Sequence, residues 1–321
     1  MLSILKNDYY RMMQRLPAVL VMTAVSLAAI ILAVYITGMQ QIKGHIVYVS
    51  GSSAAAINSK YLSVETMRQE PPYSCLVKQQ YDAYVIDKGN GKYTIITLKN
   101  NEFKNMIDEL IRHPHAKVKT QSTDRNVGVN IIGFLMMFLL MSTFMNLFTF
   151  ADDKEQKQLV RIAASPIHFS GYLFAHCIYC LSMFLPQYLL IVIIKAMGFN
   201  VGFSLLQYAL LFAALGIFGI SLALLLNTLI KKADNANMLG NSLIVLSSVL
   251  SGSFYSFSKG NAVLDNMIKV LPQKQLLDFA VHLQDGDALS HTAPLIYVIL
   301  FSVTLFAASC YILNRRYIKR L

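Results

Sequence analysis

The segment ADDKEQKQLVRIAASPIHFSG, residues 151–171, is a short charged stretch between two long apolar runs. Its first residues include three acids, Asp152, Asp153 and Glu155. Acidic residues favour a helix N-terminus, because the unpaired backbone N–H groups there carry partial positive charge. Leu159, Ile162 and Ala163 then recur at the spacing that places one apolar stripe on a helix. We therefore expect a short amphipathic helix with an acidic start.

Pro166 is expected to end this helix, because proline disfavours the helical conformation of the residue before it, here Ser165. The apolar runs on either side reach the roughly 20 residues that a helix needs to cross a bilayer. The short helix should thus lie just outside a membrane, held there by two spans. Such a helix can rest on lipid or bind a soluble partner, and we favour the partner.

The composition agrees with a membrane protein. The chain has 321 residues, of which 55% are hydrophobic and only 14% charged, and its mean hydropathy is +0.49. A soluble chain carries about 25% charged residues. A formal net charge of +11 would suggest a nucleic-acid partner for a soluble protein. Here, however, much of the positive charge lies at the ends of apolar runs, as the positive-inside rule predicts, so no nucleic-acid partner is expected.

The first part of the chain, residues 1–37, divides into an amphipathic helix and a span. Residues 2–16 are amphipathic, with apolar residues set against Lys6, Arg11 and Arg15, a pattern typical of a helix that lies in the membrane interface. Pro17 marks the turn into a first span at about 18–37. A secretory signal peptide is the alternative, but its apolar core would be only about 7–15 residues long.

Residues 38–126 form the one long hydrophilic stretch and predict a small α+β domain. Three segments rich in β-branched and aromatic residues, GHIVYVS, YDAYVID and KYTIITL, predict strands. The turn sequence DKGNG joins the last two as a hairpin. NNEFKNMIDELIRH predicts a helix with one apolar face.

Residues 127–321 are expected to hold five further spans, at 127–150, 167–194, 205–230, 238–257 and 293–313. Residues 258–292 are too apolar for a free loop and too interrupted for a span, and they predict a re-entrant or interfacial helical hairpin that breaks at Pro272. The predicted fold class is an all-α polytopic membrane protein with six transmembrane helices and a small α+β domain.

The basic residues of the short loops predict the orientation of the spans. One side of the predicted membrane collects Lys6, Arg11, Arg15, Lys154, Lys157, Arg161, Lys231, Lys232, Arg315, Arg316, Lys319 and Arg320. This side, with both termini, is expected to be cytoplasmic in the plasma membrane. The 38–126 domain is expected to be extracytoplasmic, since long domains translocate regardless of their charge.

No motif predicts an enzyme. The stretch 89–92, GNGK, lacks the Ser or Thr that would bind Mg²⁺ in a phosphate-binding loop. His113 and His115 have no neighbouring carboxylate and are interpreted as a solvated turn rather than a metal site. Cys177 and Cys180 form a C-x-x-C in the middle of a predicted span without a second ligand pair. We therefore expect no catalytic residue, no bound cofactor and no metal.

Polar residues are sparse within the predicted spans, where such groups tend to face the bundle interior or a wet cavity. The candidates for lining a transport pathway are Asn146, His176, Pro186 and Gln187. The Pro186-Gln187 pair is the strongest candidate, because proline frees a backbone carbonyl and bends the helix. The alternative is ordinary hydrogen bonding between neighbouring helices.

Several stretches together resemble type-2 ABC transporter permeases. Residues 155–166, EQKQLVRIAASP, look like the loop between the second and third spans of that family, and residues 227–237, NTLIKKADNAN, resemble its cytoplasmic turn between spans four and five. Residues 250–255, LSGSFY, resemble the SG-x-x-x-P sequence at the outer end of span five, and Leu271-Pro272 a later proline of the external hairpin. The proline of the SG-x-x-x-P sequence is absent here.

The resemblance covers about residues 127–321, together with the amphipathic start and the first span. It implies the permease subunit of an ABC exporter that binds no ATP–Mg itself. Its partners would be two copies of a separate ABC ATPase subunit, a second permease that is identical or different, and the lipid bilayer. The cargo would be amphiphilic, such as a drug, an antimicrobial peptide or a lipid-linked molecule.

In such permeases a coupling helix lies in a cleft of the ATPase and passes its movement to spans two and three. The resemblance places this role on Asp152, Asp153, Glu155, Lys157, Leu159, Arg161, Ile162, Ser165 and Pro166. It places a second cytoplasmic contact on Lys231, Lys232 and Asp234.

Two other classes of function remain as alternatives. A non-transporting receptor or scaffold would work through the 38–126 domain. An ion-coupled transporter is disfavoured, because such coupling usually needs carboxylates within the membrane, and the five later predicted spans hold none well inside.

Overall fold

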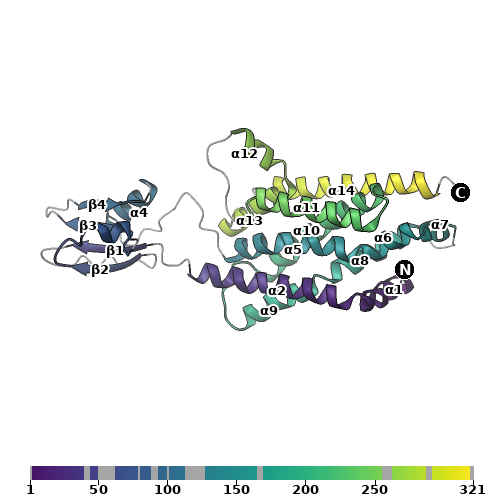
Figure 1. The fold of residues 1–321 in the computed structure, drawn as a ribbon, viewed down its shortest axis with the longest axis horizontal. Helices are drawn as coiled ribbons and strands as arrows, with labels where there is room; N and C mark the ends of the chain where they lie inside the picture. The colour runs from purple at the N-terminus through teal and green to yellow at the C-terminus, as the bar shows by residue number, and fades with distance from the viewer. Residues whose placement is uncertain are drawn as a thin grey trace. The chain divides into compact units, whose positions relative to one another are not determined.

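The computed structural model describes residues 2–39, 44–49, 62–78, 80–87, 93–99, 101–112, 127–164, 169–254, 262–286 and 291–318. The chain divides into two compact units (Figure 1). The larger, helical unit comprises Met1–Val34 and Arg125–Leu321, and the smaller comprises Tyr35–Asp124. Most described residues are helical, and one sheet of four strands lies in the smaller unit.

The chain begins with α1 (Leu2–Gln14), which coincides with the predicted amphipathic helix, and continues into α2 (Leu16–Met39). Arg15 forms the turn between them, and its N–H donates to the Met12 carbonyl at 2.9 Å. Pro17 is the second residue of α2. Proline is tolerated in the first turn of a helix, because the N–H that it lacks would have no partner there.

The second and third predicted spans are each built from two helices, which corrects the expectation of continuous ones. α5 (Val127–Asn146) is followed after Leu147 by α6 (Phe148–Glu155), so the helical run extends past the predicted end at residue 150. α8 (Phe169–Ser182) and α9 (Leu185–Ala196) are separated by Met183 and Phe184. This second break comes just before Pro186, whose missing N–H interrupts the helical ladder. Each pair still forms one apolar run long enough to cross a membrane.

Two further long apolar helices complete the core of the bundle. α10 (Leu205–Leu229) begins with a capping box, in which Ser204 Oγ accepts from the Gln207 N–H at 3.3 Å and Gln207 Oε1 accepts from the Ser204 N–H at 2.7 Å. α14 (Ala293–Leu313) passes directly into η1 (Asn314–Ile318), a short π-helix. Both helices lie where spans were predicted.

The predicted fifth span corresponds in part to α11 (Ala233–Leu250). Within the described residues, five helices are long and apolar enough to cross a membrane, and α11 is not among them. The first turns of α11 are polar and contain Asp234, Asn235, Asn237 and Asn241. The count of six spans therefore stays a prediction at this point.

The described part of the predicted hairpin consists of α12 (Ala262–Lys269) and α13 (Pro272–Asp285). The break falls at Val270 and Leu271, and Pro272 is the first residue of α13, where proline is favoured. Gly286 ends α13 with a φ of 83°, a left-handed conformation that suits glycine.

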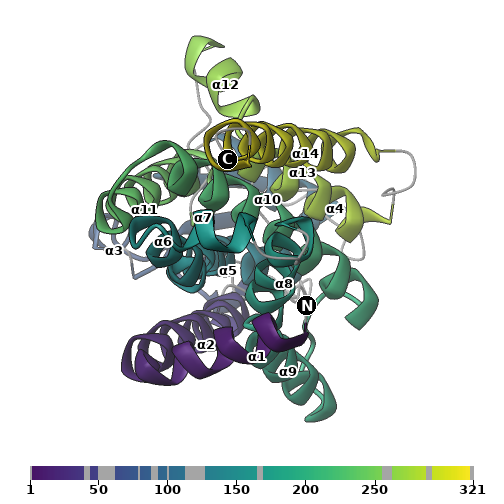
Figure 2. The ribbon, with the colours of Figure 1, turned by 90° about the vertical axis from the view of Figure 1, so that its right-hand side faces the viewer.

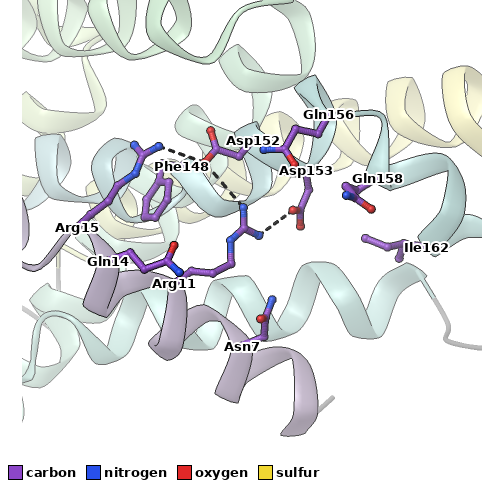
Figure 3. A pocket seen from close by; sticks show the side chains of 10 residues that line it. All are labelled: Asn7, Arg11, Gln14, Arg15, Phe148, Asp152, Asp153, Gln156, Gln158 and Ile162. Carbon is purple, nitrogen blue, oxygen red and sulfur yellow. Dashed lines mark hydrogen bonds and ion pairs between the residues drawn. The ribbon is translucent and has the colours of Figure 1, made fainter.

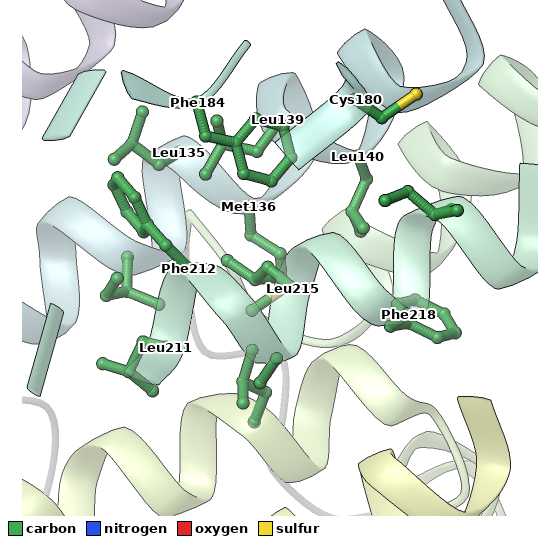
Figure 4. Close-up of a cluster of buried hydrophobic side chains, with 14 of the residues drawn as sticks. Leu135, Met136, Leu139, Leu140, Cys180, Phe184, Leu211, Phe212, Leu215 and Phe218 are labelled. Carbon is green, nitrogen blue, oxygen red and sulfur yellow. The ribbon is translucent and has the colours of Figure 1, made fainter. Parts of the chain in front are cut away.

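α5 and α10 lie at the centre of the helical unit, and the other helices surround them (Figure 2). Figure 4 shows the contact between their apolar faces, which includes Leu135, Met136, Leu139 and Leu140 of α5 and Leu211, Phe212, Leu215 and Phe218 of α10. By contrast, α2 and α14 leave many large apolar side chains exposed. An apolar outer surface of this kind suits contact with lipid.

The smaller unit is a four-stranded sheet with the strand order β2-β1-β3-β4. Its strands are β1 (Gly44–Val49), β2 (Leu62–Met67), β3 (Ala83–Asp87) and β4 (Tyr93–Thr97). β1 is parallel to both β2 and β3, and β3 and β4 are antiparallel, as the predicted hairpin requires. β2 was not predicted, although Leu62 and Val64 alternate with Ser63 and Glu65 at strand spacing.

Helices cover both faces of this sheet. α4 (Asn101–Arg112), which was predicted, packs Phe103, Ile107 and Leu110 against Ile46 and Val85. On the other face, Leu76 of the short helix α3 (Ser74–Val77) packs against Val47 and Tyr84. The unit thus has its own small hydrophobic core.

Glycines allow α5 to approach its neighbours closely. A Cβ added at Gly133 of α5 would lie 2.4 Å from the backbone oxygen of Ser253, in the turn that follows α11. A Cβ added at Gly240 of α11 would lie 2.1 Å from Cε1 of Phe144. Close backbone approach at small residues is how helices associate where lipid removes the hydrophobic driving force.

We expect Gly133→Ala to lower the stability of the helical unit, because the added methyl group meets backbone rather than a movable side chain. Overpacking of this kind costs about 1–3 kcal/mol. Gly171→Ala in α8 is the matched control, since no described heavy atom lies within 4 Å of its added Cβ. It should be neutral or stabilising by up to about 1 kcal/mol, as alanine is the better helix former. Thermal unfolding in detergent measures both, and equal midpoints for the two variants would contradict the packing described.

Candidate functional site

Residues 148–164 form a helix–turn–helix at one end of the helical unit, made of α6 and the short helix α7 (Gln158–Ala163). The start of α1 and the end of α14 lie at the same end (Figure 1). Figure 2 looks onto this end and shows α7 near its centre. The structure therefore gathers here the segment that stood out in the sequence and the two ends of the chain.

The acidic residues do not begin the amphipathic helix, which corrects the prediction. Asp152, Asp153 and Glu155 lie in the last turn of α6, whereas α7 begins at Gln158 and has no acidic residue in its described first turn. Negative charge is unfavourable at a helix C-terminus, where the unpaired carbonyl groups are themselves negative. These carboxylates therefore need partners from other elements.

The turn between α6 and α7 is made by a residue in an uncommon conformation. Lys157 has a φ of 58° and a ψ of 21°, which is the left-handed helical region. Few residues other than glycine adopt it. The Gln156 N–H donates to the Asp152 carbonyl at 2.8 Å and closes α6 just before this turn. The change of direction at Lys157 allows α7 to begin only one residue after α6 is closed.

α7 has an inner and an outer side. Leu159 is fully buried and Ile162 packs against the main core, so these two members of the predicted apolar stripe face the bundle. Lys157, Val160 and Arg161 are exposed on the outer side. The helix ends at Ala163, and Ser165 and Pro166 of the predicted site lie outside the described residues.

Arg11 of α1 and Arg15, in the turn that follows α1, neutralise two of the carboxylates (Figure 3). Arg11 Nη1 donates to Asp153 Oδ1 at 2.7 Å, and Arg15 Nη2 donates to Asp152 Oδ2 at 3.2 Å. The Arg15 guanidinium also lies 4.0 Å from the centre of the Phe148 ring, a favourable cation–π geometry. Contacts with α1 thus hold the last turns of α6 in place.

A polar pocket of about 680 Å³ opens between α1, α6 and α7. Its walls carry the ionic groups just described together with the amide side chains of Asn7, Gln14, Gln156 and Gln158 (Figure 3). Tyr172 of α8 donates to Asp153 Oδ2 at 2.7 Å. The carboxylate of Asp153 therefore joins α1, α6 and α8 at the base of α7.

Lys154 turns to the opposite side of α6 and is only 7% exposed. Its ammonium group donates to the carbonyl groups of Asn227 and Ile230, at the C-terminal end of α10. Arg316 of η1 donates to the Thr228 carbonyl at 2.8 Å. The last carbonyl groups of a helix have no partner within it, so these two cations satisfy the end of α10.

Glu155 reaches the beginning of α11. Its Oε2 accepts from the Ala233 N–H at 3.0 Å. Lys231, Lys232 and Asp234 flank Ala233 in the sequence and are exposed. The segment predicted to make the second contact therefore lies next to the first one.

His176 belongs to α8 and contacts residues of both α1 and α6. Its Nδ1 lies 2.9 Å from Asp8 Oδ2 and 3.2 Å from Thr149 Oγ1, and both members of the Asp8–His176 pair are almost completely buried. A second pocket, of about 200 Å³, adjoins this pair and is also lined by Asn7 and Tyr172. The pair binds the amphipathic start of the chain to α8.

The other candidates for a transport pathway occupy different surroundings. Pro186 lies in the first turn of α9, and Asn146 is buried at the end of α5. Gln187 is buried beside Ser26 of α2. When its amide nitrogen faces the Met183 and Phe184 carbonyls, both at 3.1 Å, its oxygen accepts from Ser26 Oγ at 2.8 Å. For Gln187 this contact favours the alternative interpretation, hydrogen bonding between helices.

Several residues of this site were not predicted for it. Lys154, Arg11, Arg15 and Arg316 were predicted only as charges that orient the spans, and no role was predicted for Asp8 or Tyr172. The sequence offered one signal for these ion pairs. Arg11 and Arg15 are four residues apart, a spacing that places side chains on one side of a helix, and the acidic cluster at 152–155 could neutralise them.

Comparison with known proteins gives one family. A family model described as ABC-2 family transporter protein matches residues 35–311. The match spans the smaller unit and all the helices from α5 to α13, with most of α14. A search of curated proteins finds no match.

The Arg11–Asp153 pair should stabilise the helical unit more than the Arg15–Asp152 pair. The Arg11 and Asp153 side chains are 20% and 13% exposed, whereas Arg15 is 52% exposed. A double-mutant cycle with Arg11→Ala and Asp153→Ala should give a coupling energy of about 1.5–3 kcal/mol. The cycle with Arg15→Ala and Asp152→Ala should give less than about 1 kcal/mol. Unfolding in detergent provides the four stabilities of each cycle, and a larger coupling for the exposed pair would refute the arrangement.

Proposed function

The chain belongs to the ABC-2 transporter family, as a multi-pass membrane permease subunit of an ABC transporter, and from this premise we propose that it is an exporter subunit moved by a separate ATPase. The observation that carries the proposal is the placement of α7. It is anchored inward by Leu159 and presents Val160 and Arg161 outward. This placement supports a role of α7 as a surface for a soluble partner.

Movement of α7 would reach several helices. α6, from which α7 continues, is bound to α1 through Arg11 and to α8 through Tyr172. It is also bound to the end of α10 through Lys154. Interfaces of this kind respond to a push by shifting as units, because packed cores do not deform continuously. ATP-driven closure of a partner dimer would therefore be passed to the spans.

The outer side of α7 indicates the chemistry of the partner surface. Lys157 and Arg161 flank the half-exposed Val160. An acidic cleft with an apolar floor would complement such a surface in charge and shape. We propose that two copies of an ABC ATPase provide this cleft, one for this chain and one for a second permease subunit, with ATP–Mg bound by the ATPases.

The same end of the bundle is proposed to be cytoplasmic. Arg11 of α1 and Arg316 of η1 both contact the group of helix ends around α6 and α10. α2 leads away from this end and α14 returns to it (Figure 1), so the number of spans from α2 to α14 must be even, which supports α11 as a sixth span. The near contact of Gly133 with the turn after α11 agrees with α11 running to the far end. The smaller unit would then be extracytoplasmic.

The cargo is proposed to be amphiphilic: a drug, an antimicrobial peptide or a lipid-linked molecule. The interior of the bundle is mostly apolar and holds scattered buried polar side chains, among them Asn146 and Gln187. Such an interior suits molecules with a large apolar part and a small polar one.

Reversing charge on the outer side of α7 should abolish ATPase binding. In Val160→Glu combined with Arg161→Glu, two carboxylates replace the surface that faces the partner, and neither original side chain is buried. We expect the variant to reach the membrane at normal levels but to lose the co-purifying ATPase. Lys195→Glu, an exposed cation at the end of α9, is the matched control and should retain it. Retention of the ATPase by the α7 variant would argue instead for a scaffold or receptor.

Cysteine labelling tests the orientation. The four native cysteines, Cys75, Cys177, Cys180 and Cys310, are first replaced. Lys157→Cys should then react with a membrane-impermeant maleimide only after permeabilisation. Lys195→Cys and Tyr73→Cys, exposed on α9 and in the smaller unit, should react on intact cells. Labelling of Lys157→Cys from outside would overturn the orientation and, with it, the ATPase-coupling role.

A further inference from the structure

Two adjacent residues of α6 contact the ends of two other helices. Lys154 donates to the carbonyl groups of Asn227 and Ile230, where α10 ends. Glu155 accepts from the N–H of Ala233, where α11 begins. A single turn of α6 therefore holds both sides of the connection between α10 and α11.

The charges match the helix ends that they contact. The C-terminus of α10 presents unpaired carbonyl groups and is partly negative, and the N-terminus of α11 presents unpaired N–H groups and is partly positive. Lys154 and Glu155 have the opposite charge in each case. Charge-assisted hydrogen bonds of this kind are stronger than neutral ones. The contact is therefore both specific and firm.

The connection itself has few internal constraints. Ile230 and Lys232 are extended, with ψ values of 132° and 133°. The Ile230 N–H bonds back into α10 at the Leu226 carbonyl, and the Lys232 carbonyl accepts from Ala236 within α11. Residues 230–233, which we name the α10–α11 joint, are therefore extended between two helix ends, and Lys154 and Glu155 of α6 contact both of those ends.

We propose that Lys154 and Glu155 are positioning residues that transmit a displacement of α7 to the α10–α11 joint. The inference rests on the proposed function, since the ATPase would impose the displacement. α7 follows Glu155 after only two residues. A shift of α7 therefore carries the two charged groups with it, and the joint follows them. α11 then moves against α5, where Gly240 adjoins Phe144.

A purely structural role for Lys154 makes a different prediction. Arg316 donates to the Thr228 carbonyl of the same helix end, but it comes from η1 and not from α6. If Lys154 only satisfied carbonyl groups, its loss and the loss of Arg316 would have the same consequences. Arg316→Met is therefore the matched control for Lys154→Met.

The test uses the chain with its co-purifying ATPase in lipid nanodiscs. Hydrogen–deuterium exchange is followed in residues 158–164 and in residues 233–241, with and without ATP–Mg. In the wild type and in Arg316→Met, both segments should change their exchange when ATP–Mg is added. In Lys154→Met and in Glu155→Leu, the change in 158–164 should persist while the change in 233–241 is lost.

Conservative variants separate transmission from folding. Lys154→Arg retains donors for the two carbonyl groups, and Glu155→Gln retains an oxygen that accepts from Ala233, so both should restore the response of 233–241. Should Lys154→Met fail to fold, the comparison of Glu155→Leu with Glu155→Gln decides alone, since the Glu155 side chain is exposed.

The two levels of proposal fail in different ways. If 158–164 responds but Lys154→Met or Glu155→Leu leaves the response of 233–241 intact, the positioning role is wrong and the proposed function stands. If Arg316→Met loses the response of 233–241 to the same extent, the positioning role is also wrong. If no ATPase co-purifies, or if 158–164 of the wild type does not respond to ATP–Mg, the proposed function itself is refuted.

Discussion

The end of α10 sets the main constraint on the end of the helical unit that holds α6 and α7, because Asn227 and Thr228 are buried and their carbonyl groups need donors from outside the helix. Lys154 and Arg316 supply those donors from two separate elements. An unpaired carbonyl group in such a place would cost several kcal/mol, roughly the price of transferring it out of water. Since Lys154 belongs to α6, the same requirement fixes α6, and with it the position from which α7 continues.

What could be predicted from the sequence followed from local patterns. The amphipathic start, the strands β1, β3 and β4, and the inward stripe of Leu159 and Ile162 all rest on spacing within a few residues, which the physics of helices and strands governs directly. The roles of the acids could not be predicted in this way. Asp153 is paired with Arg11, 142 positions away in the sequence, and nothing local shows that α6 continues as far as Glu155.

The polar residues of the spans illustrate a second limit. Pro186 was correctly expected to disturb its helix, and α8 does end shortly before it. The neighbouring Gln187, however, donates to the Met183 and Phe184 carbonyl groups at that break and accepts from Ser26 Oγ of α2. The carbonyl groups that the break leaves without a helical partner are thus paired locally. His176 proved to contact Asp8 and Thr149. A sequence identifies a buried polar group as unusual, but only the fold shows which neighbour satisfies it.

The close approach of Gly240 to Phe144 has a mechanical consequence for α11. A helix packed so tightly at one point can rock about that point more readily than it can slide past it. At about 1.5 Å per residue, the arm from Ala233 to Gly240 is roughly 10 Å long and the arm from Gly240 to Leu250 roughly 15 Å. Gly240 would act as an off-centre pivot, so that a small displacement at the start of α11 becomes a larger and opposite one toward its end, where the following turn at Ser253 adjoins Gly133.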